Sequence, residues 1–208
     1  NRFPKAKILV LEKGILPQGA STKNAGFACF GSLSEIIDDL KTHTEDEVVE
    51  LVRRRVDGLN LLKRALGEAQ INYQELGGYE LFPDTETTLF QDCLTQRERI
   101  NQLLKPIFNA EVFSLKENVF QFKNINNQYV FNQFEGQIDT GNMMQALLKK
   151  ARSKDIKILN NVTVESYLER TDSVQLKCNL FDFSTSKLLI ATNGFASQLI
   201  SQNVKPAR

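Results

Sequence analysis

The sequence has almost none of the residues from which metal sites and disulfides are built. His43 is its only histidine, and Cys29, Cys93 and Cys178 are its only cysteines, an odd number at wide spacing. This composition excludes a metal cluster built from histidines and argues against a zinc site or a disulfide framework. We therefore predict no metal centre. Widely spaced thiols are compatible with a reducing compartment, and we predict a cytoplasmic location.

The sequence also lacks a charge excess and a long hydrophobic run. Its 26 basic and 25 acidic residues are interspersed and leave a formal net charge of +1. Such a balance provides no electrostatic footprint for nucleic acid or for an anionic membrane surface. No apolar run approaches the roughly 20 residues that a membrane helix requires. We therefore predict neither a nucleic-acid partner nor a membrane span.

What the sequence does have is an apolar run near the N-terminus that ends in an acid. Residues 8–11 read Ile-Leu-Val-Leu, without alternation, and Glu12 follows. This pattern is typical of a parallel strand covered on both faces. In a doubly wound sheet, an acid at the end of the second strand accepts hydrogen bonds from ribose hydroxyls. The glycine fingerprint expected about 20 residues earlier would precede Asn1. A buried strand that ends in a solvent-facing acid explains the same pattern.

A loop of small and hydroxyl-bearing residues comes next, and it reads GASTKNAGF over residues 19–27. Glycine permits close approach of the backbone to a ligand, while serine, threonine and asparagine supply hydrogen bonds. Ser21 and Thr22 are candidates to bind a pyrophosphate, with help from a backbone nest or helix start. An ordinary polar turn has the same composition.

Taken in order, these segments resemble the D-amino-acid oxidase/glycine oxidase (DAO) family of FAD-dependent oxidoreductases. That family shows a strand reading V-L-E and then G-A-S-x-x-N-x-G, which residues 10–12 and 19–26 resemble. The Gly-Gln-Ile-Asp of residues 136–139, with the helical run after it, is similar to the family's return to its FAD domain. Residues 188–194 resemble its second dinucleotide segment, and 205–208 the start of its P-x-R-G-Q strand. The resemblance spans nearly the whole chain.

The resemblance implies which residues bind FAD. They are Glu12 for the ribose; Ser21 and Thr22 for the pyrophosphate; Asn24, Ala25, Gly26 and Phe27 beneath the isoalloxazine; Val164, through its backbone, at the adenine edge; and Ala191, Thr192 and Gly194 where the last strand meets the cofactor. No catalytic acid or base is assigned, because in this family the flavin performs the hydride chemistry. Cys29 invites a covalent-flavin reading, but we interpret it as a small buried hydrophobe.

Several helices are expected from local signals. Ser32-x-x-Glu35 and Thr44-x-x-Glu47 fit the capping box, and the second opens an amphipathic run to about Ala69 that contains Gly58. Asp84 is expected to cap a helix that ends near Pro106. Asp139 and Thr140 are expected to cap a helix that runs to about Ser153.

Strands are expected in three regions. Residues 79–82 have strand character after a Gly-Gly break, and residues 119–122 and 129–131 read as a hairpin around a Lys/Asn-rich turn. Residues 164–169, 174–180 and 188–191 resemble the β-meander with which the oxidase family covers the adenosine end of FAD.

The predicted fold class is α/β (α+β taken as a whole). It comprises a partial Rossmann-like FAD-binding domain with a β-meander, and part of an antiparallel-sheet substrate domain. Residues 1–70 form the first part of the FAD-binding domain, residues 71–135 the substrate-domain part, and residues 136–208 the second FAD-binding part. The FAD-binding domain is therefore expected to be discontinuous in sequence.

The resemblance implies a fragment of a flavin-dependent oxidoreductase that oxidises a C–N bond of an amino acid or related amine by hydride transfer to FAD. Its partner would be that small-molecule substrate. Residues 1–208 alone are expected to hold FAD weakly or not at all and to be inactive. Two alternatives remain: a non-catalytic α/β module that binds a protein or a nucleotide, and another flavoprotein of this fold, such as a glycerol-3-phosphate dehydrogenase or a tRNA-modifying oxidase.

Overall fold

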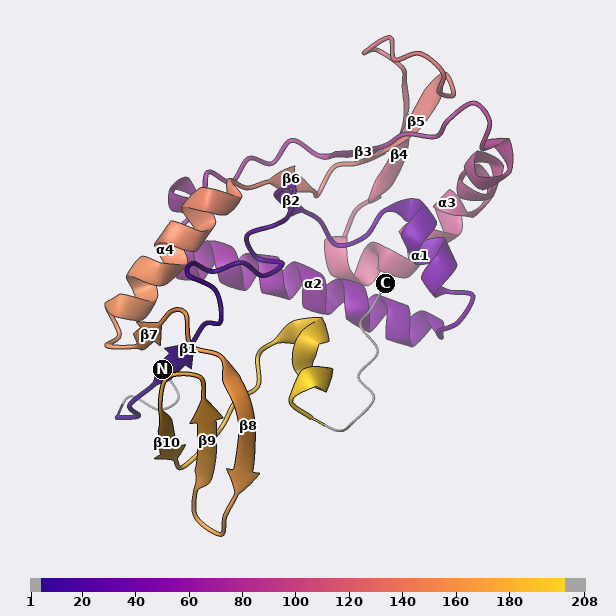
Figure 1. The fold of residues 1–208 in the computed structure, drawn as a ribbon. Helices are drawn as coiled ribbons and strands as arrows, with labels where there is room; N and C mark the ends of the chain where they lie inside the picture. Colours follow the sequence, from indigo (N-terminus) through magenta and orange to yellow (C-terminus); the bar gives the residue numbers. More distant parts are fainter. Residues whose placement is uncertain (1–4, 201–208) are drawn as a thin grey trace. The chain divides into compact units, whose positions relative to one another are not determined.

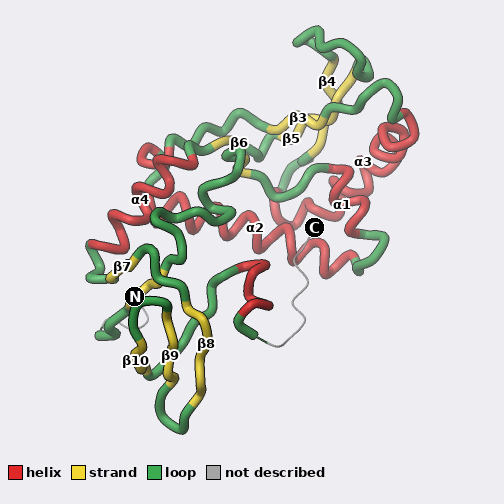
Figure 2. The backbone as a smooth tube through the Cα atoms, viewed as in Figure 1, coloured by secondary structure: helices red, strands yellow, loops and turns green. Residues whose placement is uncertain are grey.

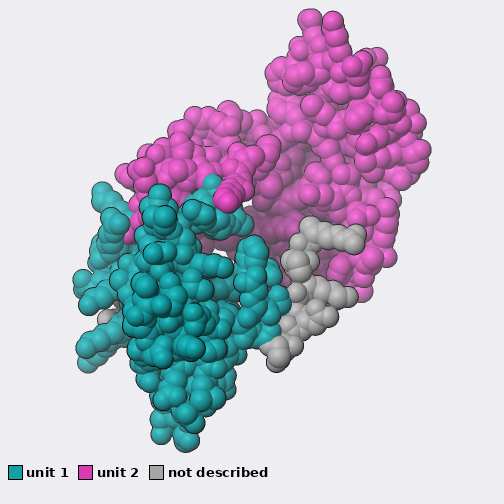
Figure 3. Space-filling model, in the orientation of Figure 1, with its two compact units in different colours: residues 1–22, 149–208 teal, residues 23–148 magenta. Residues whose placement is uncertain are grey.

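Helices and strands are mixed along the chain in the computed structural model, which describes residues 5–200 (Figures 1 and 2). This confirms the predicted mixed α/β class. The chain divides into two packed units, residues 1–22 with 149–208 and residues 23–148 (Figure 3). This division reflects packing alone, so the functional domain limits of 1–70, 71–135 and 136–208 stay predictions.

In the first unit, the N-terminal apolar run forms a parallel strand, as the sequence predicts. The prediction that both faces of this strand are covered is wrong for the described residues, because Leu9 and Val10 are 39% and 42% exposed. Strand β1 (Leu9–Leu11) pairs in parallel with β7 (Lys157–Leu159), and Val10 lies opposite Ile158. The ladder continues one residue further, because Glu12 N donates to Leu159 O at 2.9 Å. The Rossmann-like character of the FAD-binding domain stays a prediction that this parallel pair supports.

Three antiparallel strands form the predicted β-meander. They are β8 (Val164–Glu169), β9 (Val174–Cys178) and β10 (Asp182–Thr185), with β9 in the middle. One row across the sheet holds Tyr167, Leu176 and Phe183, and these side chains pack in a small cluster around buried Val162 and Cys178. Leu11 packs against the same cluster, so β1 and the meander share one core.

The third strand of the meander differs from the prediction. It is Asp182–Thr185, and Leu188–Ala191 is not a strand. The chain reverses at once after Cys178, whose N–H donates to Asp182 Oδ1 at 3.2 Å, so Asp182 pairs directly with Lys177. Residues 188–191 have no ladder partner among residues 5–200, and an apolar run without such a partner does not form a strand.

The helices of the second unit begin where the capping boxes predict. Both reciprocal boxes are present, at Ser32 before α1 (Leu33–Asp39) and at Thr44 before α2 (Glu45–Leu66). Helix α2 runs through Gly58 and ends at Leu66; its C-cap is Gly67, whose positive φ of 91° suits glycine. A short 3₁₀ turn, η1 (Ala69–Ile71), follows.

Helix α3 (Thr87–Phe108) differs from the prediction at both ends. Its N-cap is Glu86 rather than Asp84, and Glu86 makes no side-chain capping bond. Pro106 lies inside the last turn, where its missing N–H removes only one intrahelical bond, and the helix continues to Phe108. Asn109 ends it in the left-handed conformation, with φ of 51°.

A three-stranded antiparallel sheet belongs to this unit, in the order β3 (Gly78–Glu80), β5 (Gln128–Asn132) and β4 (Phe113–Glu117). The predicted hairpin exists, but its first arm is Phe113–Glu117 and not residues 119–122. The Asn118 side chain explains the difference, because it accepts from Phe122 N and donates to Phe122 O, which closes a loop. Val119 and Phe120 in that loop are exposed.

A long-range pair of short strands connects the start of this unit to its end. Strand β2 (Phe27–Ala28) pairs with β6 (Gly136–Gln137) in antiparallel orientation. Helix α4 (Thr140–Arg152) follows β6 and begins as predicted, because Asn142 N donates to Asp139 Oδ1 at 2.8 Å. Helices α1, α2 and α3 and the sheet enclose a core that includes Phe30, Leu33, Val52, Phe82, Ile100, Leu104 and Phe113.

One buried polar side chain ties α3 to β4. Asn101 is 5% exposed, accepts the N–H groups of Val112 (3.0 Å) and Phe113 (2.8 Å), and donates to Phe113 O at 2.9 Å. A single side chain therefore satisfies three buried backbone groups at the point where β4 leaves the helix.

We predict that Asn101→Ala lowers the free energy of unfolding by about 2–4 kcal/mol, because it leaves these buried groups without partners. Urea denaturation followed by far-UV circular dichroism measures the loss. The control is Gln102→Ala, at an exposed position one residue along α3, which should change the same quantity by no more than about 0.5 kcal/mol. Equal effects of the two substitutions would contradict the role of Asn101.

Candidate functional site

Glu12 lies at the carboxyl end of β1, half-buried, as the sequence predicts for a ribose ligand. One of its carboxylate oxygens, Oε1, accepts the N–H of Gly14 at 2.8 Å, and this bond orients the side chain over its own loop. Its backbone carbonyl accepts Val162 N at 3.0 Å. The carboxylate is thus held in place by one oxygen, while the other, Oε2, lies outside this bond and can accept a hydroxyl.

Val164, the predicted adenine contact, is close to Glu12 along this framework. It begins β8 two residues after Val162, and it packs in the same cluster as Leu11. The β8–β9 register shifts between Val164 and Ser166, so Glu165 forms a bulge that interrupts the ladder. The structure therefore brings together the predicted ribose and adenine contacts.

The predicted pyrophosphate ligands lie in a turn. Thr22 donates to Gly19 O through both its N–H (3.0 Å) and its hydroxyl (2.9 Å). Ser21 is exposed between them. The hydroxyl proton of Thr22 is thus engaged locally, so Ser21 is the freer donor of the two.

The predicted contacts near the C-terminal end lie on a helical turn instead of a strand end. Ala191 and Thr192 precede the 3₁₀ helix η2 (Asn193–Gln198), which contains Gly194, and Thr192 O accepts Phe195 N at 3.0 Å. The expected approach of a strand's carboxyl end is therefore absent from the described residues. Ala191 and Thr192 are exposed, and Gly194 is half-buried.

In the second unit, Asn24, Ala25, Gly26 and Phe27 form a tight loop into β2. Asn24 Oδ1 accepts both Gly26 N (2.9 Å) and Thr140 Oγ1 (3.1 Å). Gly26 has φ of 79°, and a Cβ there would collide with Ile138 O, so this position requires glycine. Ala25 is exposed and Phe27 is 77% exposed, so the loop presents an aromatic ring to solvent.

Cys29 is an exposed free thiol, which corrects our interpretation of it as a small buried hydrophobe. Side chains alternate in this extended segment, so Ala28 and Phe30 are buried while Cys29 points outward. Neighbouring atoms remove part of the solvent around the Cys29 thiol and thereby raise its pKa. The negative charges of Glu135 and Glu35 raise it further. The thiol therefore lacks the depressed pKa of a reactive cysteine.

A group of charged residues that sequence reasoning did not single out surrounds the same segment. Glu135 lies just before β6, and one oxygen of its half-buried carboxylate accepts a hydrogen bond from Phe30 N at 3.4 Å. Burial, with smaller contributions from the carboxylates of Glu35 and Glu80, raises the pKa of Glu135 to about 7. The available sequence signal was a lone acid between Phe134 and Gly136.

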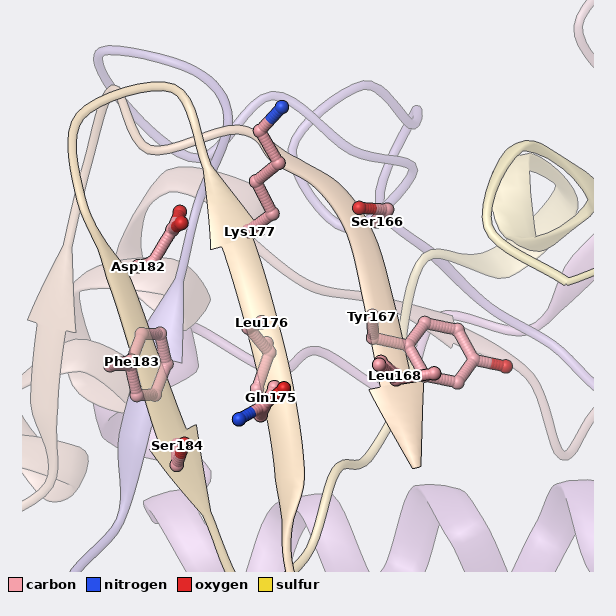
Figure 4. Close-up of a pocket in the computed structure, with 9 residues that line it drawn as sticks. All are labelled: Ser166, Tyr167, Leu168, Gln175, Leu176, Lys177, Asp182, Phe183 and Ser184. Carbon is pink, nitrogen blue, oxygen red and sulfur yellow. The ribbon is translucent and has the colours of Figure 1, made fainter. Parts of the chain in front are cut away.

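The described residues contain a hollow of about 420 Å³ that none of the predicted cofactor contacts lines (Figure 4). It lies against the meander. Its lining residues are paired across the three strands, as Ser166, Lys177 and Asp182 are. Both charged side chains there have local partners: Lys177 Nζ lies 3.7 Å from Glu165 Oε2, and Asp182 accepts Cys178 N. The hollow is open sheet surface, and it supplies no catalytic group.

Residues 5–200 contain no group of three or more His, Cys, Asp or Glu residues placed to hold a metal ion. Within the same range, no helix combines the length and apolar character needed to cross a membrane.

A family model described as FAD dependent oxidoreductase (DAO) matches residues 2–208. No curated protein matches the sequence. Among solved structures, the chain is similar to glycine oxidase from Geobacillus kaustophilus, with 16% identity and a TM-score of 0.64 over 93% of this chain and 50% of that one. It is similar to NikD, described as an unusual amino acid oxidase essential for nikkomycin biosynthesis (16%, TM-score 0.61, 94% and 47%).

A third similar structure is L-proline dehydrogenase from P. horikoshii, with 16% identity and a TM-score of 0.57 over 94% of this chain and 55% of that one. At this identity the likeness shows a shared fold. The chain spans about half the length of these three structures.

The raised pKa of Glu135 predicts how stability depends on pH. The folded chain binds this proton more tightly than the unfolded chain, whose carboxyl titrates near 4.5. The free energy of unfolding should therefore fall as the pH rises from about 4.5 through 7, by about 1–2 kcal/mol after allowance for the carboxylate's partial solvation.

Glu135→Gln cannot ionise and should remove this fall, which chemical denaturation at about pH 5 and about pH 8 measures. Glu98→Gln, at an exposed position on α3, should keep the wild-type dependence. A Glu135→Gln protein that loses stability with pH as steeply as the wild type would refute the assignment.

Proposed function

The chain belongs to the FAD-dependent oxidoreductase (DAO) family, and we propose that the protein oxidises a C–N bond of an amino acid or related amine. The match of the family model over residues 2–208, with Glu12 held at the end of β1, carries this proposal. The similar structures support an amino acid as substrate, since they are an amino acid oxidase, a glycine oxidase and an L-proline dehydrogenase.

The described residues of the first unit fit the adenosine end of FAD. A ribose offers hydroxyl donors, and Glu12 offers an oriented anionic acceptor beside the start of β8. The bulge at Glu165 leaves backbone groups near Val164 outside the regular ladder, which suits recognition of an adenine edge by the backbone. Ser21 would donate to the pyrophosphate more readily than Thr22, whose hydroxyl already donates to Gly19.

The loop Asn24–Phe27 would lie beneath the isoalloxazine. Its small residues and the required glycine keep the backbone free of side-chain bulk, and the Phe27 ring presents an apolar face. Asn24 uses its carbonyl oxygen within the loop, so we assign it to holding the loop's shape. Ala191, Thr192 and Gly194 would contact the cofactor from the turn that leads into η2.

When bound, FAD supplies the hydride acceptor, while the protein binds, orients and shields the reacting groups. The residues of this chain are assigned to holding the cofactor, and none is assigned to proton transfer. The three free thiols support a reducing compartment, and we propose the cytoplasm.

The test compares Glu12→Gln with Glu169→Gln, a control that removes an exposed acid at the end of β8. In the full-length protein, Glu12→Gln should weaken FAD binding by about 10- to 100-fold, because it removes a charge-assisted hydrogen bond. Quenching of flavin fluorescence on titration of the apoprotein measures the dissociation constant.

Glu169→Gln should bind FAD as the wild type does. Unchanged affinity in Glu12→Gln would overturn the ribose assignment. A wild-type protein that binds no FAD at all would overturn the proposal of a flavoenzyme and favour the alternative of a non-catalytic binding module.

A further inference from the structure

Two side chains of opposite charge hold the backbone of Phe30 from its two sides. The β2–β6 ladder ends where Ala28 pairs with Gly136. Beyond that point the Glu135 side chain replaces a backbone partner, because its Oε1 accepts Phe30 N at 3.4 Å. On the other side, Arg55 Nη1 donates to Phe30 O at 3.0 Å.

Phe30 and Glu135 are each anchored in the second unit. The Phe30 side chain is 2% exposed, and its ring centroid lies 4.7 Å from that of Phe108. Glu135 O accepts Gly77 N at 2.8 Å, and a Cβ at Gly78 would collide with Glu135 Oε2. The sheet therefore holds the backbone of Glu135, while its carboxylate lies between Gly78 and the segment that it binds.

Ionisable groups near Glu135 come from several elements. Glu35 of α1 and Glu80 of β3 oppose a second negative charge, and the exposed thiol of Cys29 lies beside the carboxylate. Arg55 of α2 is directed at the carbonyl of Phe30. Burial and the two acids favour the protonated form, while the N–H groups of Phe30 and Gly31 favour the anion, and the balance brings the pKa to about 7.

We propose that Glu135 is a proton-linked positioning residue for the segment Asn24–Gly31. As a carboxylate it accepts the N–H of Phe30 with a charged oxygen and fixes the path of the segment. When it takes up a proton, the carboxyl loses its negative charge and this hydrogen bond weakens. This inference rests on the proposed function in one respect: the segment is taken to support the isoalloxazine.

Amide hydrogen exchange of the full-length apoprotein, followed by mass spectrometry, tests the proposal without flavin. After correction for the intrinsic exchange rate, a peptide that covers residues 27–31 should be about fivefold more protected at about pH 8.5 than at about pH 5.5. A peptide from the interior of α3 should gain no protection over the same range, because the stability of the unit falls with pH.

Glu135→Gln should abolish the pH dependence of the 27–31 peptide, and Glu98→Gln should keep it. Glu135→Asp keeps the charge on a shorter side chain, so it should lower protection at about pH 8.5. Equal protection of the wild-type peptide at both pH values, or wild-type behaviour of Glu135→Gln, would overturn the proposal.

The alkylation rate of Cys29 against pH separates this role from a general loosening of the fold. Glu135→Gln removes a negative charge beside the thiol, so its pKa should fall, whereas Glu135→Asp should leave it near the wild-type value. Cys93 and Cys178 are buried and should stay unlabelled in both variants, which verifies that each is folded. An unchanged thiol pKa in a folded Glu135→Gln protein would overturn the proposal.

Discussion

The antiparallel pairing of β2 with β6 is the constraint on which the second unit's candidate site depends. It joins segments that are far apart in the chain: Asn24 meets Thr140 across 116 positions, and Phe30 meets Glu135 across 105. The glycine at 26 is needed because Ile138 O lies where a Cβ would be, and Ile138 N in turn donates to Gly26 O. Because so few ladder bonds hold this junction, side chains complete it.

In the first unit, the equivalent constraint is the parallel pair β1–β7. It ends at Glu12, and the next backbone bond, from Val162 N to Glu12 O, leads straight into β8. An acid and the first residues of an antiparallel meander are thereby placed at one end of one small core. Side-chain packing through Leu11 holds this arrangement, which gives the predicted ribose and adenine contacts a common framework.

Local signals predicted the starts of α1 and α2 correctly, whereas those for α3, with Asp84 as its cap and Pro106 as its end, were wrong. The capping boxes at Ser32 and Thr44 each involve residues within one turn, and both are present. The predictions failed where a partner distant in sequence, or a single side chain, decides the outcome. Leu188–Ala191 has strand composition but no ladder partner in the described part of the chain, and Asn118 closes a loop where alternation suggested a strand. The position of Glu135 could not be predicted, because its burial arises from the pairing of β2 with β6 and from contact with Gly78.

We propose that this framework serves a flavin that oxidises an amino acid or amine. The most direct measurement is the visible absorption spectrum of the purified full-length protein under anaerobic conditions, before and after addition of small amino acids and secondary amines. We expect flavin bands equivalent to the protein concentration, and their bleaching by at least one of these compounds as the flavin is reduced. A colourless protein that takes up no added FAD would contradict it.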